Sequence, residues 1–172
     1  MTLSNHQIKY RNPWIAMAWS TLFPGFGQIY NRDYLPAVLF LVSEFLINVM
    51  ANLNIGIYHA FNGDYGKSLS VLDFQWLLFY PCIYGFSIWQ AYRYAIDNNT
   101  NLPIDENTKR ASIKNAGVYI GLVVGMTLGT IWWTFMGNPI INGLVGGGIG
   151  AIIGFSIEAL FNWFLIGIGP QE

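Results

Sequence analysis

The sequence predicts an all-α fold, a polytopic helical bundle embedded in a membrane. Only 10% of the 172 residues are charged and 53% are hydrophobic, against roughly 25% and 45–50% in soluble domains. The apolar residues gather in long runs separated by polar turns. Aromatic residues make up 17% of the chain, which is typical of proteins whose rings anchor helices at membrane interfaces. We therefore expect one short or re-entrant N-terminal helix followed by four transmembrane helices.

The composition also excludes several classes of function. A net charge of −1 argues against nucleic acid, which is bound through a dense basic surface. The single cysteine, Cys82, excludes an intrachain disulfide and a multi-cysteine metal cluster. Neither histidine has a partner at metal-ligand or catalytic-triad spacing. We expect no enzymatic activity, no metal and no cofactor.

The first half of the chain is expected to hold a cytoplasmic tail at residues 1–12 and a membrane module at residues 13–97. Trp14–Phe23 supplies about ten apolar residues, half of the ~20 that a crossing requires, so it is expected to enter the membrane and return. A short full crossing that continues to Tyr30 is the alternative. The two predicted spans of this module are Leu35–Ile57 and Val71–Ile96, with a polar connection between them and a kink at Pro81.

A polar, glycine-rich turn follows the first apolar run. Its candidate residues are Pro24, Gly25, Gly27, Gln28, Tyr30 and Asn31. The glycines allow a sharp change of direction. The polar side chains could satisfy the backbone groups that a helix break leaves open at membrane depth. We interpret the stretch as a fold-defining turn first and as a binding site only second.

The second half is expected to form a cytoplasmic loop at residues 98–115 and a glycine-zipper hairpin at residues 116–172. The spans are Ala116–Met136 and part of Ile140–Ile168, joined by a tight turn. Glycines recur at every fourth position, and so on one face of each helix, at Gly117, Gly121, Gly125 and Gly129 and at Gly146, Gly150 and Gly154. Such faces let helices approach closely in lipid. The two faces are expected to pack together, or else one of them packs against another subunit.

The basic residues predict the orientation. If the first apolar run is re-entrant, seven of the eight lie on the cytoplasmic side and only Lys67 lies outside, which places both termini in the cytoplasm. If that run crosses the membrane, the division is five to three. The stronger asymmetry favours the re-entrant arrangement.

One predicted span carries a polar stripe made of Glu44, Asn48 and Asn52. Glu44 lies about 13–14 Å along the helix from Leu35, near the middle of a bilayer. The stripe must face protein or water rather than lipid. It could form hydrogen bonds within the bundle, to Ser87 or Tyr84, or it could be a site for a proton or a cation.

A second carboxylate, Glu158, continues the glycine face of the last predicted helix four residues after Gly154. It is also a candidate for the intramembrane polar site, since carboxylates within spans are costly and commonly functional. The depth of Glu158 depends on where the helix begins. Near the cytoplasmic edge it could pair with Lys114, and we favour this structural pairing.

The stretch Pro24-Gly25-Phe26-Gly27-Gln28-Ile29-Tyr30-Asn31, followed by Tyr34-Leu35, resembles the turn of small bacterial membrane proteins of the two-transmembrane-helix domain type. The resemblance covers residues 10–97 and leaves the glycine-rich hairpin unexplained. It implies an integral membrane module of unassigned biochemistry, with no catalytic residues to transfer.

Taken together, these patterns predict a multi-pass protein of the bacterial cytoplasmic membrane that is a non-enzymatic scaffold or an accessory subunit of a membrane complex. Its expected partners are the lipid bilayer and another membrane protein or a second copy, contacted through the glycine faces. The alternative is a small transporter or channel for protons, cations or a small solute that uses the intramembrane carboxylates.

Overall fold

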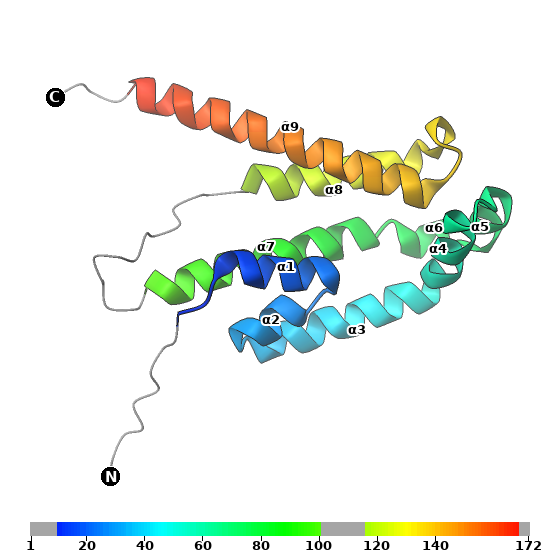
Figure 1. Cartoon of the computed structure of the whole chain (residues 1–172), viewed down its shortest axis with the longest axis horizontal. Helices are drawn as coiled ribbons and strands as arrows, with labels where there is room; N and C mark the ends of the chain where they lie inside the picture. Colours follow the sequence, from blue (N-terminus) through cyan, green and yellow to red (C-terminus); the bar gives the residue numbers. More distant parts are fainter. Residues whose placement is uncertain (1–9, 101–115, 169–172) are drawn as a thin grey trace, which may run out of the picture. The chain divides into compact units, whose positions relative to one another are not determined.

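The computed structural model describes residues 10–100 and 116–168, and within these ranges every regular element is helical, as predicted (Figure 1). The expected tail at residues 1–9 and the loop at residues 101–115, with Lys114, lie outside the described residues. Helix α9, Pro139–Ile168, is long and apolar enough to cross a membrane between Pro139 and Trp163. Two bent helix pairs raise the number of candidate spans to three if each pair is one span.

The chain forms two compact units. The first, here called the turn unit, holds the described residues of Met1–Leu41 and Ser87–Ile113. The second, called the hairpin unit, holds those of Val42–Phe86 and Lys114–Glu172. Helices α3, Tyr34–Met50, and α7, Tyr80–Thr100, each contribute residues to both units.

The turn unit begins with a helical hairpin. Helix α1, Pro13–Leu22, starts with a proline in its first turn, and the Asn12 side chain accepts hydrogen bonds from the first free backbone N–H groups. Pro24 and Gly25 then reverse the chain into the short helix α2, Phe26–Asn31. Helix α2 ends at Asn31, and Arg32 follows it in the left-handed conformation, at φ 63°. Asp33 is the last residue before α3 begins.

The predicted span Leu35–Ile57 is broken in the structure. Helix α3 ends at Met50, and helix α4, Leu53–Phe61, continues at an angle of 66°. The break falls at Asn52, whose φ of 53° is left-handed, a conformation that asparagine tolerates better than most residues. Its side chain donates a hydrogen bond to the carbonyl of Val71, the last residue of helix α5 (Tyr65–Val71).

The region between the predicted spans is helical rather than an open connection. It contains α5, Tyr65–Val71, and α6, Phe74–Leu77, whose first N–H groups bond to the Asp73 side chain. The helix axis bends by 87° between α5 and the segment Phe74–Thr100. Pro81 is the second residue of α7, where proline is tolerated, so the interruption precedes it instead of being a kink within the helix.

The remaining elements of the hairpin unit are α8, Ala116–Ile131, a single 3₁₀ turn, η1, Trp133–Phe135, and α9. Helix α8 therefore stops five residues before the predicted end of its span. Gly137, at φ 73°, makes the turn, and the buried Asn138 side chain accepts hydrogen bonds from the N–H groups of Ile140 and Ile141. Helices α8 and α9 pack along one another.

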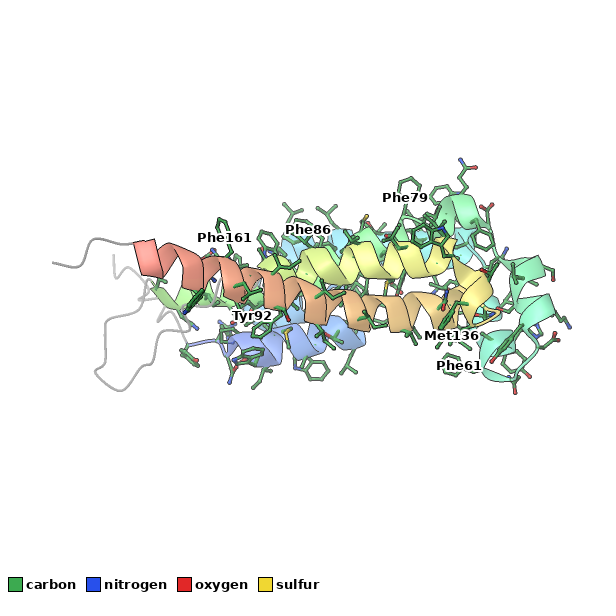
Figure 2. The ribbon with its side chains drawn as sticks, turned by 90° about the horizontal axis from the view of Figure 1, so that it is seen from above. Phe61, Phe79, Phe86, Tyr92, Met136 and Phe161 are labelled. Atoms are coloured by element: carbon green, nitrogen blue, oxygen red, sulfur yellow. The ribbon has the colours of Figure 1, made fainter. Side chains whose placement is uncertain are left out.

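The hairpin unit has a small apolar core where α3, α4 and α5 meet α6. Its buried members are Ile47, Ala51, Leu53, Leu72 and Leu77. Many large apolar side chains lie outside it: Phe61, Phe79, Phe86 and Phe161 project from the surface of the unit and are 52–70% exposed (Figure 2). Apolar residues exposed along most of a helical surface are typical of proteins surrounded by lipid.

Candidate functional site

The predicted turn residues gather around one buried side chain, that of Gln28. It is 0% exposed. Its Oε1 accepts a hydrogen bond from the Ser20 hydroxyl at 3.0 Å, and its Nε2 donates to the carbonyl of Ser87 and to Gln90 Oε1, both at 2.8 Å. Gln90 in turn donates to Asp33 at 2.7 Å. Gln28 thus joins α1 to the second half of α7 through a continuous polar network.

The two glycines of the turn are required for different reasons. Gly25 is left-handed, at φ 101°, and its N–H donates to the Ser87 hydroxyl. A Cβ on Gly25 would lie 2.8 Å from Leu41 Cγ. Gly27 has ordinary helical geometry, but a Cβ there would overlap the carbonyl of Ala16. The backbone of α2 therefore packs directly against that of α1.

The other turn residues connect the open end of the helical hairpin. The Asn31 side chain donates to the carbonyl of Ala91 at 2.7 Å. The Tyr30 hydroxyl accepts a hydrogen bond from the N–H of Asn12 at 3.1 Å, and the Arg11 guanidinium lies 5.5 Å from the Tyr30 ring centre. The beginning of α1 and the end of α2 are thus held together, and Pro24, at the opposite end of the hairpin, is fully buried.

Glu44 lies in the interior of the hairpin unit and is only 5% exposed. The side chains of Tyr80 and Asn48 are the hydrogen-bonding groups that lie beside its carboxyl group. The rings of Tyr80 and Tyr84 are stacked, with centroids 5.6 Å apart. The sequence suggested Ser87 or Tyr84 as the partner of Glu44. The structure places Ser87 against the turn and gives Glu44 the hydroxyl of Tyr80.

The predicted polar stripe does not continue as one face, because the helix ends before Asn52. Asn48 and Asn54 bond to each other across the bend: the Asn48 amide donates to Asn54 Oδ1, and the Asn54 N–H donates to Asn48 Oδ1, each at 3.2 Å. Asn52 is exposed and bonds to Val71. The structure therefore brings together Glu44 and Asn48 but separates Asn52 from them.

Glu158 lies apart from Glu44 in the contacts it makes. Its Oε2 accepts a hydrogen bond from the backbone N–H of Gly117 at 2.7 Å. Gly117 is the second residue of α8, and the first N–H groups of a helix have no partner within it. A carboxylate is well suited to this position because the helix dipole places positive charge there. The predicted partner Lys114 is outside the described residues.

The glycine faces of α8 and α9 lie against each other. A Cβ on Gly121 would overlap the carbonyl of Gly150, and one on Gly125 would overlap the carbonyl of Gly146. Gly117 and Gly154 are related in the same way, and Gly129 lies against the backbone of Asn142. The side chain of Asn142 closes this end by donating to the carbonyls of Gly129 and Trp132.

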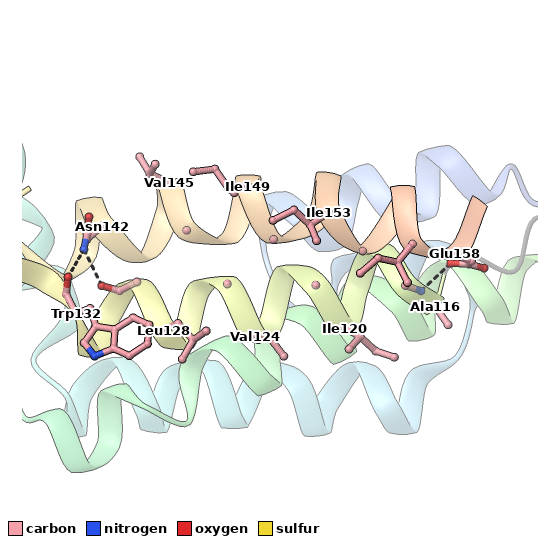
Figure 3. A pocket seen from close by; sticks show the side chains of 18 of the residues that line it. Ala116, Ile120, Val124, Leu128, Trp132, Asn142, Val145, Ile149, Ile153 and Glu158 are labelled. Atoms are coloured by element: carbon pink, nitrogen blue, oxygen red, sulfur yellow. Dashed lines mark hydrogen bonds between the residues drawn. The ribbon is translucent and has the colours of Figure 1, made fainter. Parts of the chain in front are cut away.

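An apolar groove of about 1020 Å³ runs along the same two helices (Figure 3). Its walls are aliphatic side chains, among them Ile120, Val124, Leu128, Val145, Ile149 and Ile153, and the glycines lie between them. Glu158 stands at one end and Asn142 at the other. The groove offers an extended apolar surface with almost no polar groups along its length.

Hydrogen bonds that the sequence did not predict connect the start of α9 to α4 and α5. The Asn138 amide donates to the Ser68 hydroxyl at 2.9 Å, and that hydroxyl donates to the carbonyl of Gly56 at 2.8 Å. Both Asn138 and Ser68 are fully buried. The Asn-Pro pair was a visible helix-start signal, but nothing in the sequence linked it to Ser68, 70 residues away.

The described residues contain no cluster of three or more His, Cys, Asp or Glu side chains that could hold a metal ion. Comparison of the chain with protein families, curated proteins and solved structures gave no match. The candidate sites must therefore be interpreted from their own chemistry.

Proposed function

We propose that this chain is a non-enzymatic, multi-pass protein of the bacterial cytoplasmic membrane that acts as a scaffold or accessory subunit of a membrane complex. The observation that carries the proposal is the use made of Gln28. The Gln28 side chain, at the centre of the polar turn, forms only internal hydrogen bonds among the described residues, and these join α1, α2 and α7. Polar groups that bind a small molecule line a concave site, whereas those of Gln28 are turned toward the neighbouring helices.

In the proposed topology the spans are α3, α7, α8 and α9. The first three are about 26, 32 and 24 Å long at 1.5 Å per residue, close to the ~30 Å hydrocarbon thickness. The pair α1 and α2 forms the re-entrant segment, because α1 is only about 15 Å long and the Asn12–Tyr30 bond joins its start to the end of α2. Both termini are then cytoplasmic. The relation to proteins of the two-transmembrane-helix domain type stays a prediction.

The docking surface in this proposal is the groove of α8 and α9, rather than the bare glycine faces. Those faces already cover each other, so self-association through them would require the hairpin to open. Within the hairpin unit, the aliphatic side chains that form the groove walls are exposed. Because the two helices approach closely, the groove between these side chains can accept a transmembrane helix of a partner protein. In this proposal the hairpin binds a partner helix in addition to packing its own two helices together.

The proposal can be tested by photo-crosslinking in intact membranes. A crosslinking amino acid is placed at Ile153 in the groove and, as a matched control, at Phe45 on the exposed side of α3. A protein adduct of one defined mass from Ile153, absent from Phe45, is expected. Adducts with lipid alone at both positions would overturn the docking role.

Ion flux provides the second test. The purified protein in proteoliposomes is expected to give no proton or cation flux above that of empty vesicles. Flux that is abolished by Glu44→Gln would overturn the scaffold assignment in favour of transport.

A further inference from the structure

The interior of the hairpin unit contains one carboxyl group whose surroundings are incomplete. Glu44 is 5% exposed, and its Oε2 has no hydrogen-bond partner among the described residues. The hydroxyl of Tyr80 and the amide of Asn48 are the hydrogen-bonding groups beside the carboxyl group. A buried acceptor with no partner is unfavourable, and more so when it carries a charge.

The titratable side chains around Glu44 in the described part of the chain are neutral. They are the hydroxyls of Tyr80 and Tyr84 on α7. The ion pairs of the described residues are His59–Asp64 and Arg93–Asp97, and neither includes Glu44. An unpaired carboxylate buried in this way is unfavourable, and a bound proton removes its charge.

We propose that Glu44 is a proton-binding site in the interior of the bundle. The carboxylate takes up one proton and becomes a neutral carboxylic acid, while Tyr80 and Asn48 hold its orientation. This inference does not depend on the scaffold role. It assigns a bound ligand, a proton, to Glu44 on α3, which the proposed docking surface of α8 and α9 does not include.

The surrounding chemistry selects a proton over a metal ion. A metal ion such as Mg²⁺ or Ca²⁺ requires about six oxygen ligands, whereas the described neighbours of Glu44 are the side chains of Tyr80, Tyr84 and Asn48. No second carboxylate joins Glu44 in a potential metal cluster among the described residues. A single proton needs only the one carboxyl oxygen.

Infrared spectroscopy of the full chain in lipid nanodiscs tests the proposal directly. The wild type near neutral pH is expected to show a carbonyl band of a protonated carboxylic acid. Glu44→Gln should remove this band, and Glu158→Gln should leave it, because Glu158 bonds to Gly117 and takes no part in the surroundings of Glu44. A wild-type spectrum without the band, or a band that persists in folded Glu44→Gln, would overturn the proposal.

A chemical readout avoids dependence on any variant. The lipid-soluble reagent dicyclohexylcarbodiimide adds to a protonated carboxyl group: the acid proton moves to a carbodiimide nitrogen, and the carboxyl oxygen bonds to the central carbon. Peptide mass spectrometry of the wild type is expected to locate the adduct at Glu44, with a yield that falls as pH rises. An adduct at Glu158 instead, or a yield independent of pH, would contradict the assignment.

Discussion

The carboxylate of Glu158 accepts a hydrogen bond from the backbone N–H of Gly117, so a side chain of α9 caps the first turn of α8. This bond fixes the two helices lengthwise at one end of their contact. At the other end, Asn142 donates to the carbonyls of Gly129 and Trp132. The smooth glycine faces between them contain no side chains to resist sliding, and these polar contacts set their register.

Replacement of Glu158 should therefore reduce stability according to what the new side chain can accept. Glu158→Leu leaves the Gly117 N–H without its partner and is expected to cost about 1–2 kcal/mol. Glu158→Gln keeps an acceptor oxygen and should cost less. Thermal unfolding in detergent, followed by circular dichroism, measures the difference. Equal stability of the Leu and Gln variants would show that the cap contributes nothing.

The glycine faces predict opposite effects for two alanine substitutions in the same hairpin. Gly121→Ala places a methyl group into the carbonyl of Gly150 and should destabilise the protein by about 1–3 kcal/mol. Gly148→Ala meets no atom within 4 Å and should be neutral or stabilise by up to about 1 kcal/mol through helix propensity. The same unfolding measurement compares them. A neutral Gly121→Ala would contradict the close packing of the two helices.

Gln28→Leu should be among the most damaging polar substitutions in the chain. It leaves the Ser20 hydroxyl and the Gln90 side chain without a shared partner in the interior, at an expected cost of about 2–3 kcal/mol. The matched control is Gln75→Leu on the exposed side of α6, which should change stability by less than about 0.5 kcal/mol. Similar unfolding temperatures for the two variants would show that the hydrogen bonds of Gln28 do not stabilise the contact between α1, α2 and α7.

Gly25→Ala tests the backbone requirement of the turn. The left-handed conformation costs a residue with a Cβ about 1–2 kcal/mol, and the new methyl group would also press on Leu41. Gly66→Ala, in α5 with no atom within 4 Å, is the control and should be tolerated. Both variants are compared by thermal unfolding. Equal tolerance would mean that the turn can adopt another conformation.

The re-entrant topology predicts the side from which single cysteines react. In a Cys82→Ser background, cysteines at Tyr10 and Arg32 should be labelled from the cytoplasmic side and a cysteine at Lys67 from the outside. Labelling with a membrane-impermeant maleimide in intact cells and in inverted vesicles separates the two. Reaction of positions 10 and 32 from opposite sides would show that α1 and α2 together cross the membrane.

Sequence patterns predicted the helical class and the existence of the main helices, because apolar run length and four-residue glycine spacing are local signals. They did not predict the ends. Helix α3 ends inside a predicted span, because Asn52 is left-handed there and its side chain donates to the carbonyl of Val71, which lies 19 residues further along the chain. Pro81 marked the right region of α7 but not the form of the break.

The candidate sites, like the helices, could be predicted only in part from the sequence. Glu44 could be recognised from its place in an apolar helix, yet its partner Tyr80 could not be told from Tyr84 or Ser87. All three lie on α7, and the choice depends on the register between two helices. That register is set by three-dimensional packing, which no spacing within one helix encodes.

The bond between Gly25 and Ser87 has a consequence for the order in which the protein is made. The α1–α2 hairpin leaves the ribosome before α7, and the groups of α7 that bond to Gly25 and Gln28 follow about sixty residues later. At 5–20 residues per second, roughly 3–12 s of synthesis separate them. During that interval the hairpin holds polar groups whose partners on α7 have not yet been made.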